Sequence, residues 1–196
     1  MCCGKDDNLK QQISNISHLI CTDFAEVSVN QAEERYNEIK NRPRFFLTVE
    51  FIAWDAKHAN QCDFYLDPNV QIDLTSYEFV FHFCFEYLPQ VEQMLHNAAN
   101  CLKPSDFFNG AMPDANEFLR RQRKANDTKF GNSIFELKLQ FEPNCPPLFG
   151  AKYDFHIEEV VDCSEFLVHF PTFVKLAARY NQGERQSFGD YYHKMI

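Results

Sequence analysis

Short apolar segments alternate along this chain with amphipathic helical segments, and an aspartate lies at the end of each of the first two apolar segments. Two segments have the length and composition of strands, His18 to Phe24 and Phe45 to Trp54. The apolar run of the first ends at Asp23, and Asp55 directly follows the second. Strands that alternate with helices form a parallel sheet with right-handed crossovers. The order of segments therefore predicts an α/β fold.

The other elements are predicted from hydrophobic period and from helix start and stop signals. Ser28 to Gln31 has the pattern of a capping box, which predicts a helix from there to about Lys40, stopped by Pro43. We further expect strands over 72–83 and 107–112, and helices over 88–102 (ended by Lys103-Pro104), 117–124 (opened by a second capping box, Asp114 to Glu117) and 171–180. Alternation in 133–141 and 149–157 predicts an antiparallel pair appended to the parallel sheet. No linker divides the chain, so we expect one domain over residues 1–196.

Charge and cysteine usage exclude several classes of protein. The net charge of −9, from 19 Lys and Arg against 28 Asp and Glu, argues against a general nucleic-acid binder but not against a pocket that reads one nucleotide. The most apolar stretch, Phe79 to Phe85, is far shorter than the ~18 residues of a membrane span. The start of the chain has no secretory pattern, so we expect the eight cysteines to be free thiols, several of them buried. No C-x-x-C spacing is present, so a zinc site is not expected.

The two aspartates at strand ends point to a nucleoside ligand. In open α/β sheets, ligands bind at the carboxyl ends of the strands, where a carboxylate can accept hydrogen bonds from both ribose hydroxyls. Each aspartate taken alone is as readily explained as a turn or helix cap. The glycine loop expected of such a site is weak, because Cys2 to Lys5 holds a single glycine, Gly4.

Several longer stretches resemble the eukaryotic messenger-RNA cap guanine-N7 methyltransferase family, and the resemblance runs from about Cys2 to Tyr192. The stretches that carry it are Ile20 to Gln31, Val49 to Asp55, Phe79 to Glu86, Phe130 to Asn132, Pro147 to Gly150, Lys152 to Phe155 and Val160 to Pro171. The resemblance implies a class I S-adenosylmethionine-dependent methyltransferase fold, a Rossmann-like sheet with helices on both faces. It also implies transfer of a methyl group from S-adenosylmethionine to N7 of the cap guanine. That nitrogen carries a free lone pair, so proximity and orientation suffice and no catalytic acid or base is expected.

On the methyl-donor side, the resemblance assigns five residues. Asp23 matches the ribose-binding acid and Asp55 the acid beside the adenine, while Gly4 lies in the cofactor loop. Glu78 stands where the family usually has glutamine, and Phe83 where it has tyrosine. These two departures are expected to weaken cofactor binding, because one adds a carboxylate and the other removes a hydroxyl.

On the cap side, the resemblance assigns Glu165 to the guanine edge and His82 to cap contact. It also assigns three basic residues to the cap phosphates, Lys5, Lys10 and Arg35. Two further residues, Pro113 and Tyr153, are assigned to the lining of the guanine pocket. Without the motif, His82 reads as a core histidine, Arg35 as a solvated cation beside Glu38, and Glu165 as a first-turn helix acid. The basic run from Arg120 to Lys124 reads most simply as a solvated helix face, and contact with the RNA body is the sharper alternative.

The resemblance also places Met1 to Gly4 inside the cofactor loop, so the first strand of the family, which is central in its sheet, is expected to be missing. The final strands of the family are expected to be missing as well. The strands at His18 and Ile72 would then face a gap, and the chain alone would be a poor methyltransferase. The alternatives are a non-catalytic fragment or interaction module, and a methyltransferase for another substrate, against which Glu165 and His82 argue. The expected partners are the capped 5′ end of mRNA, an activating subunit and the transcription machinery, without a membrane, and the expected location is the nucleus.

Overall fold

The computed structural model describes residues 16–180 except positions 44, 58, 68, 126 and 159. The predictions for Gly4, Lys5 and Lys10 therefore lie outside the described residues. The strands and longer helices are β1 (His18–Asp23), α2 (Glu26–Ile39), β2 (Thr48–Ala53), β3 (Ile72–Glu78), α3 (Leu88–Asn100), β4 (Leu102–Ala111), α4 (Ala115–Ala125), β5 (Lys129–Gly131), β6 (Phe135–Leu139), β7 (Lys152–Ile157), β8 (Val161–Phe166) and α5 (Phe170–Ala177). Short 3-10 helices cover Gln61–Phe64 (η1), Phe81–Phe83 (η2) and Ala178–Tyr180 (η3).

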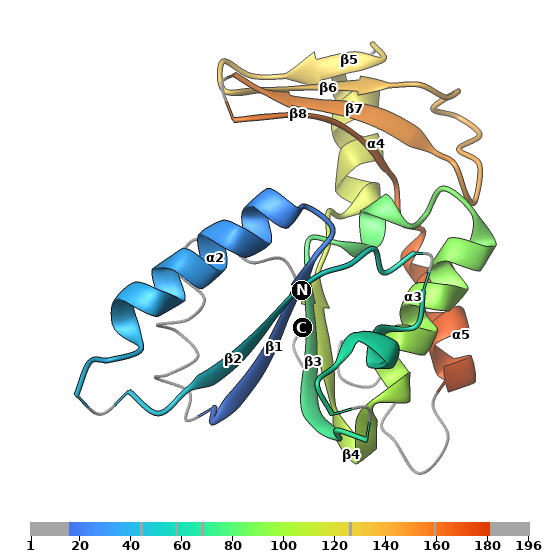
Figure 1. The fold of residues 1–196 in the computed structure, drawn as a ribbon. Helices are drawn as coiled ribbons and strands as arrows, with labels where there is room; N and C mark the ends of the chain where they lie inside the picture. Colours follow the sequence, from blue (N-terminus) through green and yellow to red (C-terminus); the bar gives the residue numbers. More distant parts are fainter. Residues whose placement is uncertain are drawn as a thin grey trace.

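The lower part of the molecule in Figure 1 is built from two pairs of parallel strands. β1 pairs with β2, and α2 packs on them through a small apolar cluster that includes Cys21, Val29 and Ala32. β3 pairs with β4, and α3 and α5 cover one face of that pair. The largest core lies there, where Tyr77 and Phe81 pack against α3 and α5. The predicted α/β fold is confirmed.

β1 and β3 do not pair with each other within the described part of the chain, so the parallel strands form two separate two-stranded sheets. The outer edges of β2 and β4 also have no strand partner among the described residues.

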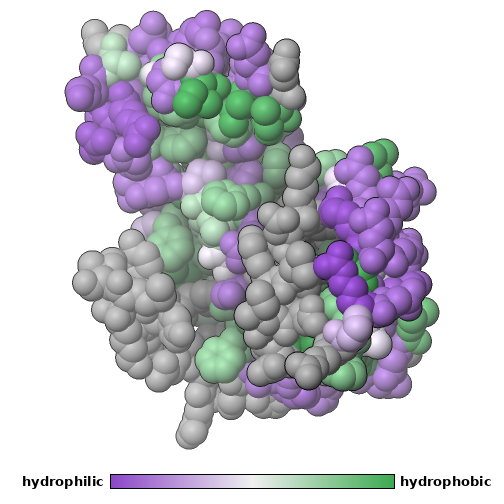
Figure 2. Space-filling view, turned by 90° about the vertical axis from the view of Figure 1, so that its left-hand side faces the viewer, coloured by the Kyte–Doolittle hydropathy of each residue, from purple (hydrophilic) through white to green (hydrophobic). Residues whose placement is uncertain are grey.

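An antiparallel layer lies above the parallel strands in Figure 1. Its strand order is β5-β6-β7-β8, and α4 packs on its apolar face through Phe118 and Leu119. The predicted antiparallel pair corresponds to β6 and β7, while β5 and β8 were not foreseen. In Figure 2 the surface of this layer is mainly hydrophilic, with one hydrophobic band.

Several predicted boundaries were wrong for local physical reasons. α2 begins before Ser28, because the Asp23 carboxylate accepts the Ala25 N–H at 2.9 Å and already turns the chain. The second capping box is half right: Asp114 accepts the Asn116 N–H at 2.8 Å, but Glu117 pairs with arginines instead of reaching back. α3 ends at Asn100, before Lys103-Pro104, and β4 begins at Leu102.

The cysteines depart from expectation in one place. Cys62 in η1 and Cys101 at the end of α3 form a disulfide, although 39 residues separate them in the sequence. The prediction of free thiols was therefore wrong for this pair, whereas it is confirmed for the buried Cys21 and Cys84. The crosslink attaches the loop that follows β2 to α3.

Within residues 16–180, apart from the five positions left out, no helix has the length and hydropathy needed to cross a membrane. The same residues contain no group of three or more His, Cys, Asp or Glu side chains that could hold a metal ion.

Candidate functional site

A pocket opens at the carboxyl ends of β1 and β2, where the sequence predicted a ligand. Three of the predicted donor-side residues, Asp23, Asp55 and Phe83, line it together. Glu78, the fourth, is exposed at the end of β3 and outside the pocket lining, where it accepts a hydrogen bond from Ser76 at 2.9 Å. The structure thus brings together residues that lie 60 positions apart at most in one concave surface.

The two aspartates are oriented by the chain turns that follow their strands. Oδ1 of Asp23 accepts the Ala25 N–H at 2.9 Å, and Oδ1 of Asp55 accepts the Lys57 N–H at 3.0 Å. Each carboxylate therefore closes an Asx-type turn and also faces the pocket. The turn-cap interpretation of both residues is therefore confirmed, while their binding of a ligand stays a prediction that this geometry permits.

Two buried polar groups in the pocket wall support a nucleoside ligand. The Thr22 hydroxyl and the Trp54 indole N–H have no hydrogen-bond partner among the described residues, and both side chains line the pocket. Buried polar groups are nearly always satisfied, so an orphaned pair in one wall indicates polar atoms missing from that place. With Val80 and Met94 as apolar walls, the pocket suits a base joined to a polar sugar.

A second cluster of polar residues is built around the Glu165 carboxylate on β8. Directly across the ladder on β7, the Tyr153 hydroxyl donates a hydrogen bond to Oε2 of Glu165. Nε2 of His82, in η2, lies 3.5 Å from Oε1, and the Cys163 thiol contacts that oxygen at 3.4 Å. Glu165 is 7% exposed, His82 3% and Tyr153 0%, so these side chains form a buried polar cluster.

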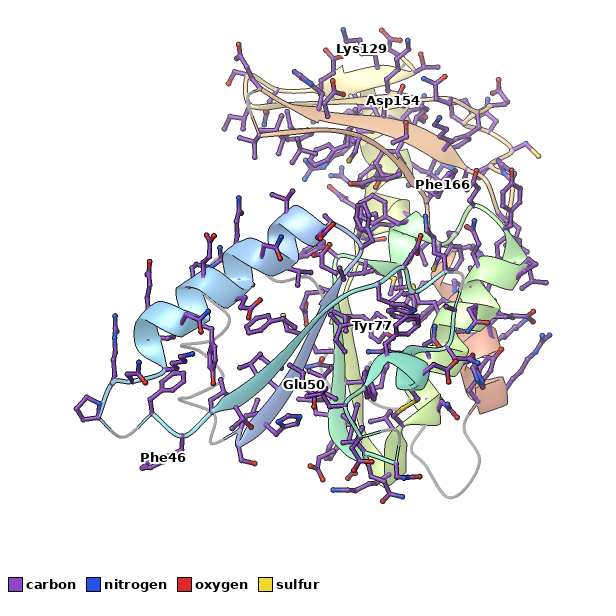
Figure 3. All side chains as sticks on the ribbon, in the orientation of Figure 1. Phe46, Glu50, Tyr77, Lys129, Asp154 and Phe166 are labelled. Atoms are coloured by element: carbon purple, nitrogen blue, oxygen red, sulfur yellow. A yellow bond between two sulfur atoms is a disulfide. The ribbon has the colours of Figure 1, made fainter. Side chains whose placement is uncertain are left out.

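The cluster lies where the antiparallel layer meets the helical core. Phe166, which follows Glu165, packs against the core formed by α3 and α5, and Figure 3 shows it at this joint. His82 comes from the parallel part of the molecule and Glu165 from the antiparallel part. The two parts therefore meet through a carboxylate–histidine contact.

Hydrogen bonding keeps Glu165 ionised despite its burial. Burial alone would raise the pKa of its carboxyl, but the hydrogen bonds from His82 and Tyr153 outweigh it and hold this pKa below the ordinary value. Burial and the charge of Glu165 raise the pKa of the Tyr153 hydroxyl far above its ordinary value, and burial raises the pKa of the Cys163 thiol to about 11. Both groups therefore stay protonated donors, and the carboxylate remains an acceptor at neutral pH.

Two other predicted cap-side residues come from other elements. Arg35 lies in the middle of α2, half-buried, and Pro113 lies between β4 and α4. Their predicted roles stay predictions, as do those of Gly4, Lys5 and Lys10.

Sequence reasoning missed Phe79, which stands out in the structure. It has a φ of 52°, a conformation that bulky side chains rarely adopt, and it is 57% exposed although aromatic. Strained residues of this kind concentrate at binding sites. Phe24, Trp54 and Lys57 in the pocket wall were also missed. For Phe24 and Trp54 the available signal was their position beside the strand-end aspartates, but a positive φ leaves no trace in a sequence.

Parallel strands with acids at their carboxyl ends beside a pocket form an open α/β sheet that binds its ligand at the strand ends. This arrangement is consistent with the fold of class I S-adenosylmethionine-dependent methyltransferases. A protein of Pyrococcus horikoshii OT3 known from its crystal structure has a similar fold, with a TM-score of 0.54 and 15% sequence identity over 90% of this chain and 68% of that chain.

The profile described as the mRNA (guanine-N(7))-methyltransferase domain matches residues 1–196. The mRNA cap guanine-N(7) methyltransferase of Drosophila melanogaster is 49% identical over 206 residues, covering 100% of this chain and 48% of that protein. The enzyme of the same name from Caenorhabditis briggsae is 33% identical over 177 residues, covering 86% of this chain and 46% of that protein. The chain belongs to the mRNA (guanine-N(7))-methyltransferase domain family, and it spans about half the length of these relatives.

Proposed function

We propose that the protein transfers a methyl group from S-adenosylmethionine to N7 of the guanine that caps messenger RNA. The observation that carries this proposal is the adjacency of His82 and Phe83. His82 contacts the Glu165 carboxylate, while Phe83 lines the pocket, and their ring centroids are 4.3 Å apart. A donor in the pocket and a guanine at Glu165 would thus be neighbours.

The donor side relies on positioning. When bound, S-adenosylmethionine supplies a methyl group activated by a positively charged sulfur. Asp23 and Asp55 would hold the sugar and base through their carboxylates, with Val80 and Met94 against the flat faces of the base. Trp54 and Thr22 offer donors whose hydrogen bonds are otherwise unmade.

The acceptor side relies on recognition rather than on acid–base chemistry. The N1–H and N2–H groups of guanine form a two-donor edge, which an ionised carboxylate can accept in bidentate fashion. Glu165 is such a carboxylate, and Tyr153 fixes its orientation from across the ladder. The ring of Phe79, a residue with a strained backbone conformation, is exposed and available to stack on a base. Because N7 of neutral guanine has a free lone pair, alignment of donor and acceptor is sufficient.

The proposal extends to partners and location in the same terms. The capped 5′ end of mRNA is the substrate, an activating subunit and the transcription machinery are the protein partners, and the nucleus is the site of action. The family membership of the chain supports the first of these most directly.

The direct test is methyl transfer from labelled S-adenosylmethionine to a guanosine-capped oligoribonucleotide that lacks the N7 methyl group. We expect the label to appear in 7-methylguanosine after nuclease digestion, and a pre-methylated cap to accept none. Label at another position of the RNA would contradict the proposal. Cap binding without any transfer would favour a non-catalytic interaction module.

Replacing Asp23 by asparagine should weaken binding of S-adenosylhomocysteine by about tenfold, because a charge-assisted bond to the sugar is lost while the turn-closing oxygen stays. Replacing it by alanine should add a loss of stability of about 1 kcal/mol, since the Ala25 N–H then loses its acceptor. Calorimetric titration and thermal unfolding of both variants separate the two roles. Unchanged ligand affinity in both variants would mean that Asp23 only closes the turn.

A further inference from the structure

The segment from residue 115 to residue 131 is basic in an otherwise acidic chain. It contains five of the 19 Lys and Arg residues but only two of the 28 Asp and Glu residues. Most of these cations lie on α4, where four of them fall within the five positions from Arg120 to Lys124. The local charge is thus opposite to that of the whole protein, whose net charge is −9.

The cations on α4 are exposed and only partly neutralised. Arg120 and Arg121 share a single carboxylate, that of Glu117, at 2.6 Å each. Arg123 and Lys124 are exposed, and no contact of either with a carboxylate is among the ion pairs of the described residues. Exposed ion pairs contribute little and are screened by salt, so a polyanion can displace Glu117 at small cost.

α4 is held firmly next to the proposed guanine site. Its Phe118 ring packs on the Tyr153 ring with 4.9 Å between centroids, and Tyr153 in turn hydrogen-bonds Glu165. At the other end the buried Gln122 side chain donates to the Asp127 carbonyl oxygen at 3.2 Å. An 11-residue helix is about 16 Å long, so its cations lie within a few nucleotides of the guanine.

We propose that the exposed cations of α4, Arg123 and Lys124 above all, bind the phosphate backbone of the RNA just downstream of the cap. This inference rests on the proposed function, because it requires a capped RNA at Glu165. The ligand is the phosphodiester chain itself, recognised by charge without base contacts. A phosphate backbone is favoured over an acidic protein segment because Phe118 attaches α4 to Tyr153 and thereby to Glu165, so an RNA whose cap guanine lies at Glu165 has the cations of the same helix within its reach.

The test compares two probes on the full chain, a cap dinucleotide and a short oligoribonucleotide with the same cap. The double variant Arg123→Ala and Lys124→Ala should bind the capped oligoribonucleotide about tenfold more weakly at moderate salt, and its affinity should fall less steeply with salt concentration. Its affinity for the cap dinucleotide should be unchanged. Lys40→Ala with Arg42→Ala is the matched control, since these two exposed cations lie at the far end of α2 and their removal changes the net charge equally.

The outcomes are separable. An unchanged affinity for the capped oligoribonucleotide would overturn the inference and leave α4 to an acidic protein partner. An equal loss in the control variant would also overturn it, because net charge alone would then explain the effect. If the unmodified protein binds neither probe, the proposed function itself fails, which is a different result from a loss confined to the α4 variant.

Discussion

Replacing Glu165 by alanine is expected to weaken binding of a cap dinucleotide by about a hundredfold or more. Two hydrogen bonds from guanine to a charged acceptor are lost, each contributing about 1.5–3 kcal/mol, and the N–H donors of the guanine are left unpaired in a site shielded from water. Titration of the cap dinucleotide into the variant, followed by fluorescence or calorimetry, measures the effect. Binding of S-adenosylhomocysteine should change little, because Glu165 is not part of the pocket lining.

The stability of this variant must be measured alongside its affinity. Alanine at position 165 removes the acceptor of the buried Tyr153 hydroxyl and the partner of His82, so the free energy of unfolding should fall by about 1–3 kcal/mol. Tyr153→Phe is the matched control, because it keeps the ring that packs on Phe118 and removes only the hydroxyl that orients Glu165. We expect a smaller loss of cap affinity for Tyr153→Phe than for Glu165→Ala. Equal cap affinity in wild type and Glu165→Ala would contradict the assignment of the guanine edge.

The sequence predicted that Asp23 and Asp55 would lie close together, because their positions depend on regular structure. A strand that ends at an aspartate is visible as an apolar run followed by an acid, and parallel strands bring such ends to one edge. Asp23 and Asp55 therefore meet in one pocket as expected. Glu78 obeyed the same pattern but points elsewhere, since a neighbouring serine on its own strand holds it by a hydrogen bond.

The cap side was predictable only through resemblance to a family. β8, which carries Glu165, reads Val-Asp-Cys-Ser-Glu-Phe, and its alternation of apolar and polar residues breaks at Glu165, where the polar residue is the buried one. The strand is hard to recognise because a polar residue occupies a buried position, where an apolar residue would complete the alternating pattern. A binding site of this kind weakens the very signal by which its strand could be recognised.

Contacts between distant segments left no signal at all. Cys62 and Cys101 are separated by 39 residues, and nothing in their spacing distinguishes them from the other cysteines. The same holds for the side chains on α3 that hold the loop following β2. That loop carries Ala56 and Lys57 into the pocket wall directly after Asp55, so the site depends on a contact that only the structure reveals.

Asn97, on α3, is the center of that contact. Its side chain is 3% exposed, and its amide donates to the carbonyl oxygens of Ala56 and Ala59 at 2.9 Å each. Its carbonyl oxygen accepts the Gln61 N–H at 3.1 Å. One side chain thus satisfies three backbone groups of a loop that has no strand or long helix to satisfy them.

Asn97→Ala should therefore lower the free energy of unfolding by about 3 kcal/mol, because the Ala56 carbonyl and the Gln61 N–H lose their partner and the Ala59 carbonyl keeps only its hydrogen bond from Gln93. For a chain of this size that corresponds to a fall in melting temperature of about 6–12 °C. Asn100→Ala is the control, since Asn100 is exposed on the same helix and donates only to the Cys62 sulfur at 3.4 Å. Its melting temperature should stay close to that of the wild type.

The same substitution should weaken binding of S-adenosylhomocysteine, and more strongly in a reducing buffer than in an oxidising one. With the Cys62–Cys101 disulfide intact, the loop remains attached to α3 after Asn97 is lost, whereas reduction releases its second attachment. Calorimetric titration of the variant with and without a reductant measures the difference. If Asn97→Ala lowers the melting temperature but leaves the affinity unchanged in both buffers, then the loop supports the fold without shaping the pocket. An effect on affinity that appears only after reduction would instead show that the amide and the disulfide hold the same wall of the site.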